Sequence, residues 1–354
     1  MSSIDYQRRA FLRGVSRRYL ATLLCIAALV TAGGVMWYVR LHRQAADPSA
    51  LVSLSFRSPI PEISTGQTPL FIAREKGIFA AHGLRVTLEQ GGREVSPVAM
   101  VAGGNNDLGM VGGPETLLVA RGRGVPIRAI AVLHRNANFP AFITLKSSGI
   151  QNLSQLQGKE VGFFPGHITT DVLKALLRRS QISVHEVNVG FDYNQLVAGK
   201  LAAQWGFTVR AALELPQKGV EINVLRASDY GISTHGYTIF ALEKTINERP
   251  QDCERFLRAL FAGIDYTLTH PKEAADLLQR LNPVLERAFI EKSEAMFNAV
   301  LSHSSEFPPG YMDRAMFESA YTYLKESAAI ATEFDVHDAY TTRFLEQIYG
   351  RRFE

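Results

Sequence analysis

The chain is poor in cysteine, with only Cys25 and Cys253 among its 354 residues. Cys25 lies inside an apolar N-terminal segment, behind Leu23 and Leu24, and these residues are a poor match to a lipid-attachment motif. The rest of the chain keeps a single cysteine. This scarcity excludes a disulfide framework and a cysteine-based metal site after the apolar segment.

Motifs of the common enzyme classes are missing as well. The chain has no Gly-x-x-x-x-Gly-Lys phosphate loop and no Gly-x-Ser-x-Gly nucleophile elbow. His185 and Glu186 lack the second histidine of a His-Glu-x-x-His zinc pair. The acidic residues form no obvious pair of general acid and base, so the sequence predicts no enzyme, no metal and no cofactor.

A basic excess is present only at one end of the chain. Lysine and arginine total 38 against 34 acidic residues, with a pI near 9.0. The first 44 residues hold seven arginines and one acid, which leaves 31 basic and 33 acidic residues in the remainder. The positive charge therefore belongs to a targeting segment, and we expect no nucleic-acid partner.

One long apolar run is present, from Tyr19 to Val39, and arginines precede it. About twenty apolar residues span a hydrocarbon core of ~30 Å, and the preceding charges keep the N-terminus in the cytoplasm. Residues 1–44 are thus predicted to hold a transmembrane or signal segment at 19–39, with the remainder outside the inner membrane. Arg8 to Arg13 also matches a twin-arginine export signal, and both the export route and cleavage stay open.

The stretch from Phe71 to Gly113 predicts alternating helices and strands separated by glycine turns. Pro69 to Phe79 has helical spacing, Val86 and Leu88 alternate with polar residues, and Leu108 to Val111 is an apolar run typical of a buried parallel strand. A second series of strands and an amphipathic helix at Thr169 to Ser180 follows. The predicted class is α/β.

Several short motifs in these segments carry a family resemblance. They are Ala73-Arg74-Glu75-Lys76-Gly77-Ile78-Phe79, His82-Gly83-Leu84, Gly91-Gly92, residues 97–103 before Asp107-Leu108-Gly109, and Leu156 to Gly162. The pattern, up to about Pro271, resembles the NMT1/THI5-like solute-binding proteins for thiamine-pyrimidine precursors, sulfonates, nitrate and taurine. The resemblance implies a periplasmic binding protein of type II, with lobe 1 at 49–137 and 243–354 and lobe 2 at 138–242. Two crossover strands, near 136–142 and 235–240, would form the hinge.

The loops that follow strands are the expected ligand site, because ligands of open parallel sheets collect at the carboxyl ends of strands. Free N–H groups at helix N-termini favour an anion or a polar head there. The predicted residues are Glu62 and Gln67 after the first strand, Gly113, Pro114, Glu115 and Thr116 in the same lobe, and Phe164, Gly166, His167, Thr169 and Thr170 in the other. For each loop, a plain turn or helix cap is the alternative.

Aromatic residues and one arginine complete the predicted site. Tyr193 and Trp205, with Phe164 and Phe207, would stack on a planar ligand, or else fill the core. Where pyrimidine-precursor members of the resembled family carry an asparagine-glutamate pair, this chain has residues 208–212, including Arg210. A guanidinium prefers carboxylate, sulfonate or phosphate, which favours an anionic or zwitterionic solute over a thiamine precursor.

The resemblance implies a monomeric solute-binding protein that delivers a small molecule to an ABC permease and its ATPase. It would work outside the cytoplasm, anchored to the inner membrane or secreted. The eukaryotic relatives that make the thiamine pyrimidine carry a histidine and a cysteine-rich motif, and this chain lacks that cluster. The alternative is a membrane-anchored sensing or accessory module with the same fold.

Overall fold

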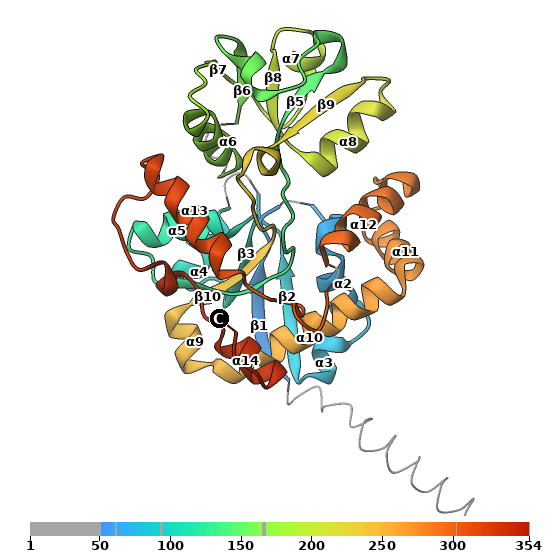
Figure 1. Cartoon of the computed structure of the whole chain (residues 1–354). Coiled ribbons are helices and arrows are strands. Elements are labelled where there is room, and N and C mark those ends of the chain that lie inside the picture. Colours follow the sequence, from blue (N-terminus) through green and yellow to red (C-terminus); the bar gives the residue numbers. More distant parts are fainter. Residues whose placement is uncertain (1–50, 61, 93–94, 165–167, 302, 354) are drawn as a thin grey trace, which may run out of the picture. The chain divides into compact units, whose positions relative to one another are not determined.

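Two separate five-stranded sheets organise the chain (Figure 1). The computed structural model describes residues 51–60, 62–92, 95–164, 168–301 and 303–353. The predicted leader, residues 1–44 with the apolar run 19–39, lies outside them. Within the described ranges, no helix is both long and apolar enough to cross a bilayer.

The first sheet is mixed. Its strand order is β2 (Leu84–Glu89), β1 (Val52–Arg57), β3 (Leu108–Val111), β10 (Thr238–Leu242) and β4 (Ile127–Val132). β1 pairs in parallel with β2 and β3, whereas β10 is antiparallel to β3 and β4. The alternation predicted for β2 is present, because Leu84 and Val86 are buried and Arg85 and Thr87 are exposed. We call this sheet and its helices the first lobe.

The second sheet has the same mixed character. Its order is β7 (His185–Asn188), β6 (Glu160–Phe163), β8 (Ala203–Phe207), β5 (Pro140–Leu145) and β9 (Ile222–Arg226). β6 is parallel to β7 and β8, and β5 is antiparallel to β8 and β9. We call this sheet and its helices the second lobe. The predicted α/β class with two sheets is confirmed.

Helices cover both sheets. Those of the first lobe are α2 (Thr68–Glu75), α3 (Ile78–Ala81), α4 (Pro97–Ala102), α5 (Pro114–Gly122), α9 (Glu243–Glu248), α10 (Pro250–Thr269), α11 (Pro271–Leu281), α12 (Arg287–Leu301), α13 (Arg314–Glu326) and α14 (Arg343–Tyr349). Those of the second lobe are α6 (Ile168–Arg179), α7 (Asn194–Val197) and α8 (Thr208–Gln217). Short 3-10 turns add η1 (Thr65–Gln67), η2 (Lys146–Ser148), η3 (Leu153–Leu156), η4 (Ala227–Tyr230) and η5 (Val336–Ala339). Gly77, with φ of +70°, separates α2 from α3 in a left-handed conformation that favours glycine.

Two local predictions need correction. Apolar alternation in the sequence predicts a strand from Val187 to Phe191, but β7 ends at Asn188, because only residues 185–188 pair with β6. The strand at residues 238–242 belongs to the first sheet, although the predicted boundary assigned these residues to the second lobe. Otherwise the division into residue ranges stays a prediction, since Val52 to Glu354 form one compact unit.

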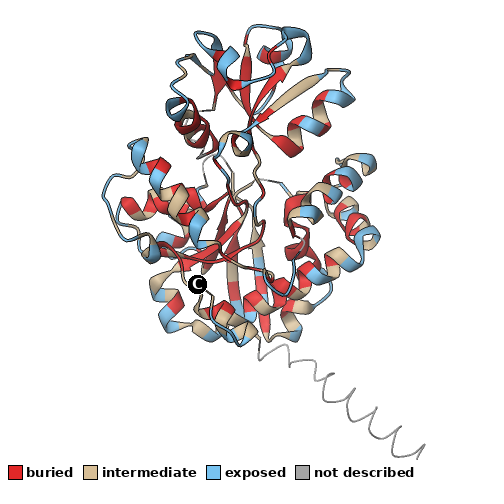
Figure 2. Ribbon diagram, viewed as in Figure 1, coloured by how far each residue is buried: buried red, intermediate tan, exposed pale blue. Residues whose placement is uncertain are grey.

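Buried residues run along both sheets (Figure 2). In the first lobe, Phe256 of α10 stacks on Phe56 of β1 and Phe79 of α3, with ring centroids 5.3 and 5.4 Å apart. The apolar core of the second lobe continues into the first, because Leu118 of α5 and Tyr323 of α13 belong to the same buried cluster as the α6 leucines. α13 packs against both α5 and α6, so it bridges the two lobes.

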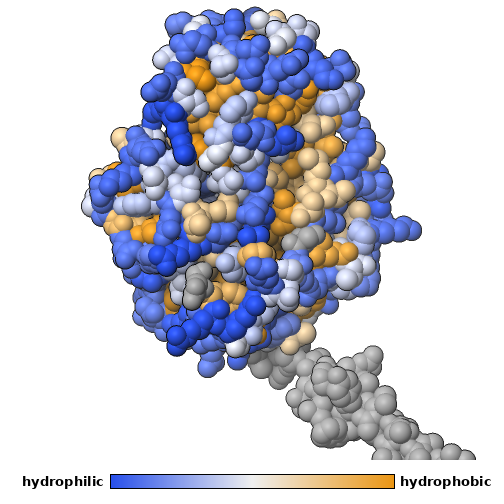
Figure 3. All heavy atoms as spheres, in the orientation of Figure 1, coloured by the Kyte–Doolittle hydropathy of each residue, from blue (hydrophilic) through white to orange (hydrophobic). Residues whose placement is uncertain are grey.

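Apolar surface is most evident over the second lobe, in the upper part of the view in Figure 3. Three large hydrophobic residues are exposed within the described ranges: Phe191, Val197 and Val284. Two of these three belong to the second lobe.

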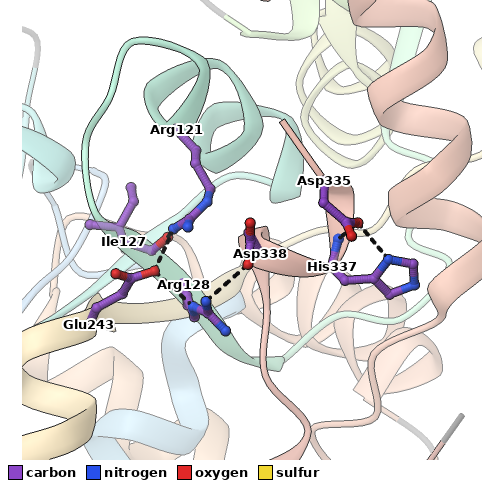
Figure 4. A network of polar contacts seen from close by, with 7 residues as sticks. All are labelled: Arg121, Ile127, Arg128, Glu243, Asp335, His337 and Asp338. Atoms are coloured by element: carbon purple, nitrogen blue, oxygen red, sulfur yellow. Dashed lines mark hydrogen bonds and ion pairs between the residues drawn. The ribbon is translucent and has the colours of Figure 1, made fainter. Parts of the chain in front are cut away.

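An ion-pair network ties the C-terminal segment to the first sheet (Figure 4). Glu243 accepts from Arg121 and Arg128, each at 2.9 Å, and Arg128 also reaches Asp338 of η5 at 3.1 Å. The hydrogen bond from Arg128 is the main cause that lowers the pKa of Glu243. The network holds η5 against β4, and η5 leads into α14.

Candidate functional site

Two crossing segments, 133–139 and 231–237, connect the sheets and pair with each other. The Leu133 N–H donates to the Tyr237 carbonyl and the Gly236 N–H to the His134 carbonyl, both at 2.7 Å. Asn138 takes a left-handed φ of +49° and accepts the Thr234 N–H on its side-chain oxygen at 2.8 Å. Asparagine tolerates this conformation better than most residues. The pairing brings residues 134 and 235 together between the sheets.

A small cavity lies between the lobes beside these segments. It is lined by Gly112 and Glu115 of the first lobe, by Phe139, Pro140, Thr234 and His235 at the crossing, and by Thr169, Val172 and Phe207 of the second lobe. Its volume is about 20 Å³. That is room for about one water molecule. Any organic solute held here would need the lobes to move apart first.

Glu115 supplies the cavity's only carboxyl group among the lining residues. It is 3% exposed, and Oε1 accepts from the Tyr323 hydroxyl at 2.7 Å. It forms no ion pair with any residue that the structure describes. Burial raises the pKa of Glu115, against the opposing effect of hydrogen bonds from Tyr323 and its own backbone. A side chain at Gly113 would meet the carboxylate, because a Cβ there would lie 2.4 Å from Oε2.

His235 is a neutral imidazole at the same cavity. The Asn136 N–H donates to its Nδ1 at 3.2 Å, which assigns the proton of the ring to Nε2. Nε2 and the Thr234 hydroxyl have no hydrogen-bond partner among the described residues. Burial lowers the pKa of His235 to about 4. We call Glu115, Thr234 and His235 the polar set.

His134 is enclosed by aromatic rings next to the cavity. Its ring centroid lies 4.9 Å from Tyr237, 5.1 Å from Phe297 and 6.1 Å from Phe139. Neither ring nitrogen makes a hydrogen bond of normal geometry within the described residues, although the nearby Gly66 backbone favours protonation. Burial nevertheless lowers the pKa of His134 to about 3. We call these four side chains the histidine box.

Helix α12 supplies a further buried acid near this box. Glu294 accepts a hydrogen bond from the Thr68 hydroxyl, and Ser293 lies 2.5 Å from Thr65 between their hydroxyl oxygens. Glu294 Oε2 has no partner among the described residues. Burial raises the pKa of Glu294 to about 7. Phe297 follows one turn later and packs over Gly66, so α12 connects η1 to the histidine box.

Four aromatic side chains of the second lobe pack together next to the cavity. Phe164 stacks on Trp205 with centroids 5.6 Å apart, Phe191 lies 4.7 Å from Phe164, and Phe207 lies 6.1 Å from Trp205. We call these four residues the aromatic cluster. Phe207 also lines the cavity. The cluster therefore reaches the interlobe space through one of its members.

Arg210 stands beside this cluster but is engaged with other groups. Its Nε donates to Glu214 at 2.6 Å, one helical turn away in α8, and its guanidinium carbon lies 5.9 Å from the Phe191 ring centroid. It does not line the cavity. Tyr193 is buried beneath the cluster.

The structure brings together only part of the predicted site. Glu115 and Thr169 line the cavity, next to Gly112. Gly113 precedes α5, and Pro114 and Thr116 lie in its first turn, outside the cavity lining. The Thr170 hydroxyl donates to the Phe164 carbonyl at 2.8 Å, Gln67 is buried against Ser58, and Glu62 is exposed. Gly166 and His167 lie outside the described residues.

Residues of the crossing segments were missed as site residues. Thr234, His235 and Phe139 line the cavity. Phe297 of α12 packs against Phe139, and Glu294 lies one turn before Phe297 in the same helix. Their neighbours are far away in sequence; Asn136 and His235, for example, are 99 residues apart. The only sequence signal for this group was His134, just past a strand end.

Comparison with solved structures shows that the fold is that of periplasmic binding proteins. The aliphatic sulphonate binding protein SsuA from Escherichia coli superposes with a TM-score of 0.66 at 13% identity, covering 81% of this chain and 91% of that one. At this identity the likeness establishes the fold alone.

The chain belongs to the NMT1/THI5 like family, whose model matches residues 64–274. The resemblance derived from the sequence is thereby confirmed. The riboflavin-binding protein RibY from Chloroflexus aurantiacus is 25% identical over 306 residues, which cover 81% of this chain and 84% of RibY.

A second relative corrects the prediction that the chain is no enzyme. The 4-amino-5-hydroxymethyl-2-methylpyrimidine phosphate synthase of Legionella pneumophila is 25% identical over 284 residues, covering 78% of this chain and 88% of the synthase. Membership of the family therefore does not exclude catalysis.

Proposed function

We propose that this chain is an extracytoplasmic solute-binding protein that closes its two lobes over a small organic molecule and delivers it to an ABC permease and its ATPase. The observation that carries the proposal is the cavity walled by both lobes at a paired crossover. A ligand that contacts both walls stabilises the closed arrangement by its differential contacts.

The chemistry of the two walls supports a solute with a flat, partly apolar body. Phe139, Pro140 and Phe207 offer ring faces and an apolar edge, and the polar set offers a few hydrogen-bonding groups. Such a mixture is typical of small-molecule sites. The relatives agree with this class, since one is named for binding riboflavin and another for making a pyrimidine phosphate.

Two ligand classes remain in the proposal: an anionic or zwitterionic solute such as a sulfonate, and a thiamine pyrimidine precursor. The fold of SsuA is compatible with the first, and the relative named as a pyrimidine phosphate synthase with the second. An uncleaved leader would anchor the monomeric receptor in the membrane of its permease, whereas a cleaved leader would release it outside the cytoplasm.

The test is whether the purified full chain binds candidate solutes, as measured by equilibrium dialysis and by the melting temperature. We expect at least one of riboflavin, the pyrimidine alcohol and an alkanesulfonate to bind with one site per chain. Binding should raise the melting temperature in proportion to the logarithm of solute concentration above Kd. If none of them binds and none raises the melting temperature, the proposed function is contradicted.

A further inference from the structure

The charges around the interlobe cavity are unbalanced. Glu115 is the one acidic lining residue, and no lysine or arginine lines the cavity within the described part of the chain. The other lining groups are hydroxyls, an imidazole, apolar side chains and backbone. A buried site without a cation, in which burial already raises the pKa of its own carboxyl group, is poorly suited to a negative charge.

Two arginines on neighbouring segments are already paired with acids. Arg135, close to His235, forms an ion pair with Asp313 at 3.2 Å and lies 3.9 Å over the Phe307 ring. Arg210 is paired with Glu214 at 2.6 Å. Neither arginine lines the cavity, so an anion between the lobes would gain no direct partner from either without breaking an existing pair.

The imidazole does not supply the missing charge. Its Nδ1 accepts the Asn136 N–H, and the neutral ring leaves an N–H donor at Nε2. Burial keeps the pKa of His235 near 4, so the ring carries no charge at neutral pH. The polar set thus combines one carboxyl group with neutral hydrogen-bonding groups.

From this arrangement we infer that Glu115 determines ligand charge: the part of the solute held between Glu115 and His235 is an uncharged ring with both hydrogen-bond donors and acceptors, and anions are rejected. The inference rests on the proposed function and narrows its ligand class. Tyr323 fixes the carboxyl by its hydroxyl at 2.7 Å, and Gly113 leaves the space that the carboxyl occupies. The ring would rest against Phe139 and Phe207 once the lobes have parted.

Two matched pairs of probes test the inference on the full chain. Each pair shares one ring and differs by a phosphate: riboflavin with riboflavin 5′-phosphate, and 4-amino-5-hydroxymethyl-2-methylpyrimidine with its phosphate. Equilibrium dialysis at pH 7.5 should give the unphosphorylated member of a bound pair at least a tenfold lower Kd. Equal or tighter binding of the phosphorylated members by the wild type would overturn the inference.

The variant Glu115→Gln keeps the shape of the side chain and an acceptor for Tyr323, but cannot ionise. We expect it to reduce the discrimination between the members of a pair at least fivefold, mainly by tighter binding of the phosphate. Glu326→Gln, an exposed change on the same helix as Tyr323, should leave the discrimination unchanged. An unchanged ratio in a folded Glu115→Gln variant would count against the inference.

The wild-type comparison stands even if Glu115→Gln does not fold, so the inference stays testable. If the proposed function itself is wrong, neither member of either pair binds, so no ratio of Kd values can be measured. That outcome differs from equal or tighter binding of the phosphorylated members. Binding of the phosphorylated members alone would leave the receptor function intact and contradict only the role of Glu115.

Discussion

The two lobes face the interlobe space with different chemistry. The first lobe and the crossing segments bring buried groups that titrate, with Glu115, His134 and His235 close to the cavity and Glu294 behind them. The second lobe brings the aromatic cluster, of which Phe207 lines the cavity. The difference suggests a division of roles: one side selects by hydrogen bonds and charge, and the other provides apolar surface for burial.

This comparison also separates two sources of stability. Large buried rings stabilise a lobe at every pH, whereas buried acids and histidines stabilise or destabilise it according to their protonation. Changes to the aromatic cluster should therefore have pH-independent effects. Changes to the buried acids and histidines should act only in a defined pH range.

The largest effect is expected from Trp205→Ala. Trp205 is 3% exposed and contacts three rings of the aromatic cluster, so its removal should cost about 3 to 5 kcal/mol of unfolding free energy. Urea denaturation followed by far-UV circular dichroism measures the loss. Phe191→Ala, at a ring that is 38% exposed, is the control and should cost clearly less.

The next effect comes from Glu294, with the opposite sign. Its pKa is raised to about 7 from 4.5, so the folded state favours the protonated acid. The stability gained is complete below pH 4.5 and is lost as the pH rises through about 7. Glu294→Gln should therefore match the wild type at pH 4 and exceed it at pH 8 by about 3 kcal/mol.

The control for Glu294 is Glu291→Gln, on an exposed position of the same helix. It should shift stability by little at either pH. If Glu294→Gln is less stable than the wild type at pH 8, the carboxylate is stabilised by interactions that burial does not describe, and the pH assignment is wrong.

The smallest of the three effects is expected at His134. Burial lowers its pKa to about 3, so the folded state favours the neutral ring. Stability is complete above pH 6.5 and falls as the pH drops toward 3. His134→Phe, which keeps a ring in the histidine box, should remove about 2 kcal/mol of the acid-induced loss at pH 4.5.

The two pH effects oppose each other between pH 4.5 and 6.5. As the pH falls through that range, Glu294 adds stability while His134 and His235 remove it. In this range His134→Phe should have the shallowest pH dependence of stability, because the contributions of Glu294 and His235 then cancel. Glu294→Gln should have the steepest dependence and the double variant should keep the wild-type slope, and denaturation curves at four pH values measure these slopes. His185→Gln, at an exposed histidine, should leave the slope unchanged.

Local structure was predictable because it depends on neighbouring residues. The amphipathic helix at 168–179 and the strands at 84–89 and 108–111 follow from apolar spacing within about ten residues. Glu115 was predicted as a site residue in the same way, because it follows the end of a strand. The pairing of Arg210 with Glu214 was also visible in the sequence, since the two residues are one helical turn apart.

The remainder of the site depends on contacts that no local pattern encodes. Tyr323 meets Glu115 across 208 residues, and Glu294 meets Thr68 across 226. His235 reaches the cavity only because the two crossing segments pair. The prediction therefore included Glu115, Thr169 and Phe207 of the cavity and missed Thr234, His235 and the Tyr323 hydroxyl that bonds Glu115.

The most direct test of the account is the distance between the lobes with and without solute. Spin labels at Lys200→Cys in the second lobe and Lys244→Cys in the first, both exposed, report this distance by double electron-electron resonance in a Cys25→Ser chain. The account predicts that a bound solute narrows the distance distribution and shifts its mean. A solute that binds at one site per chain, as equilibrium dialysis measures it, and leaves the distribution unchanged would contradict binding between the lobes.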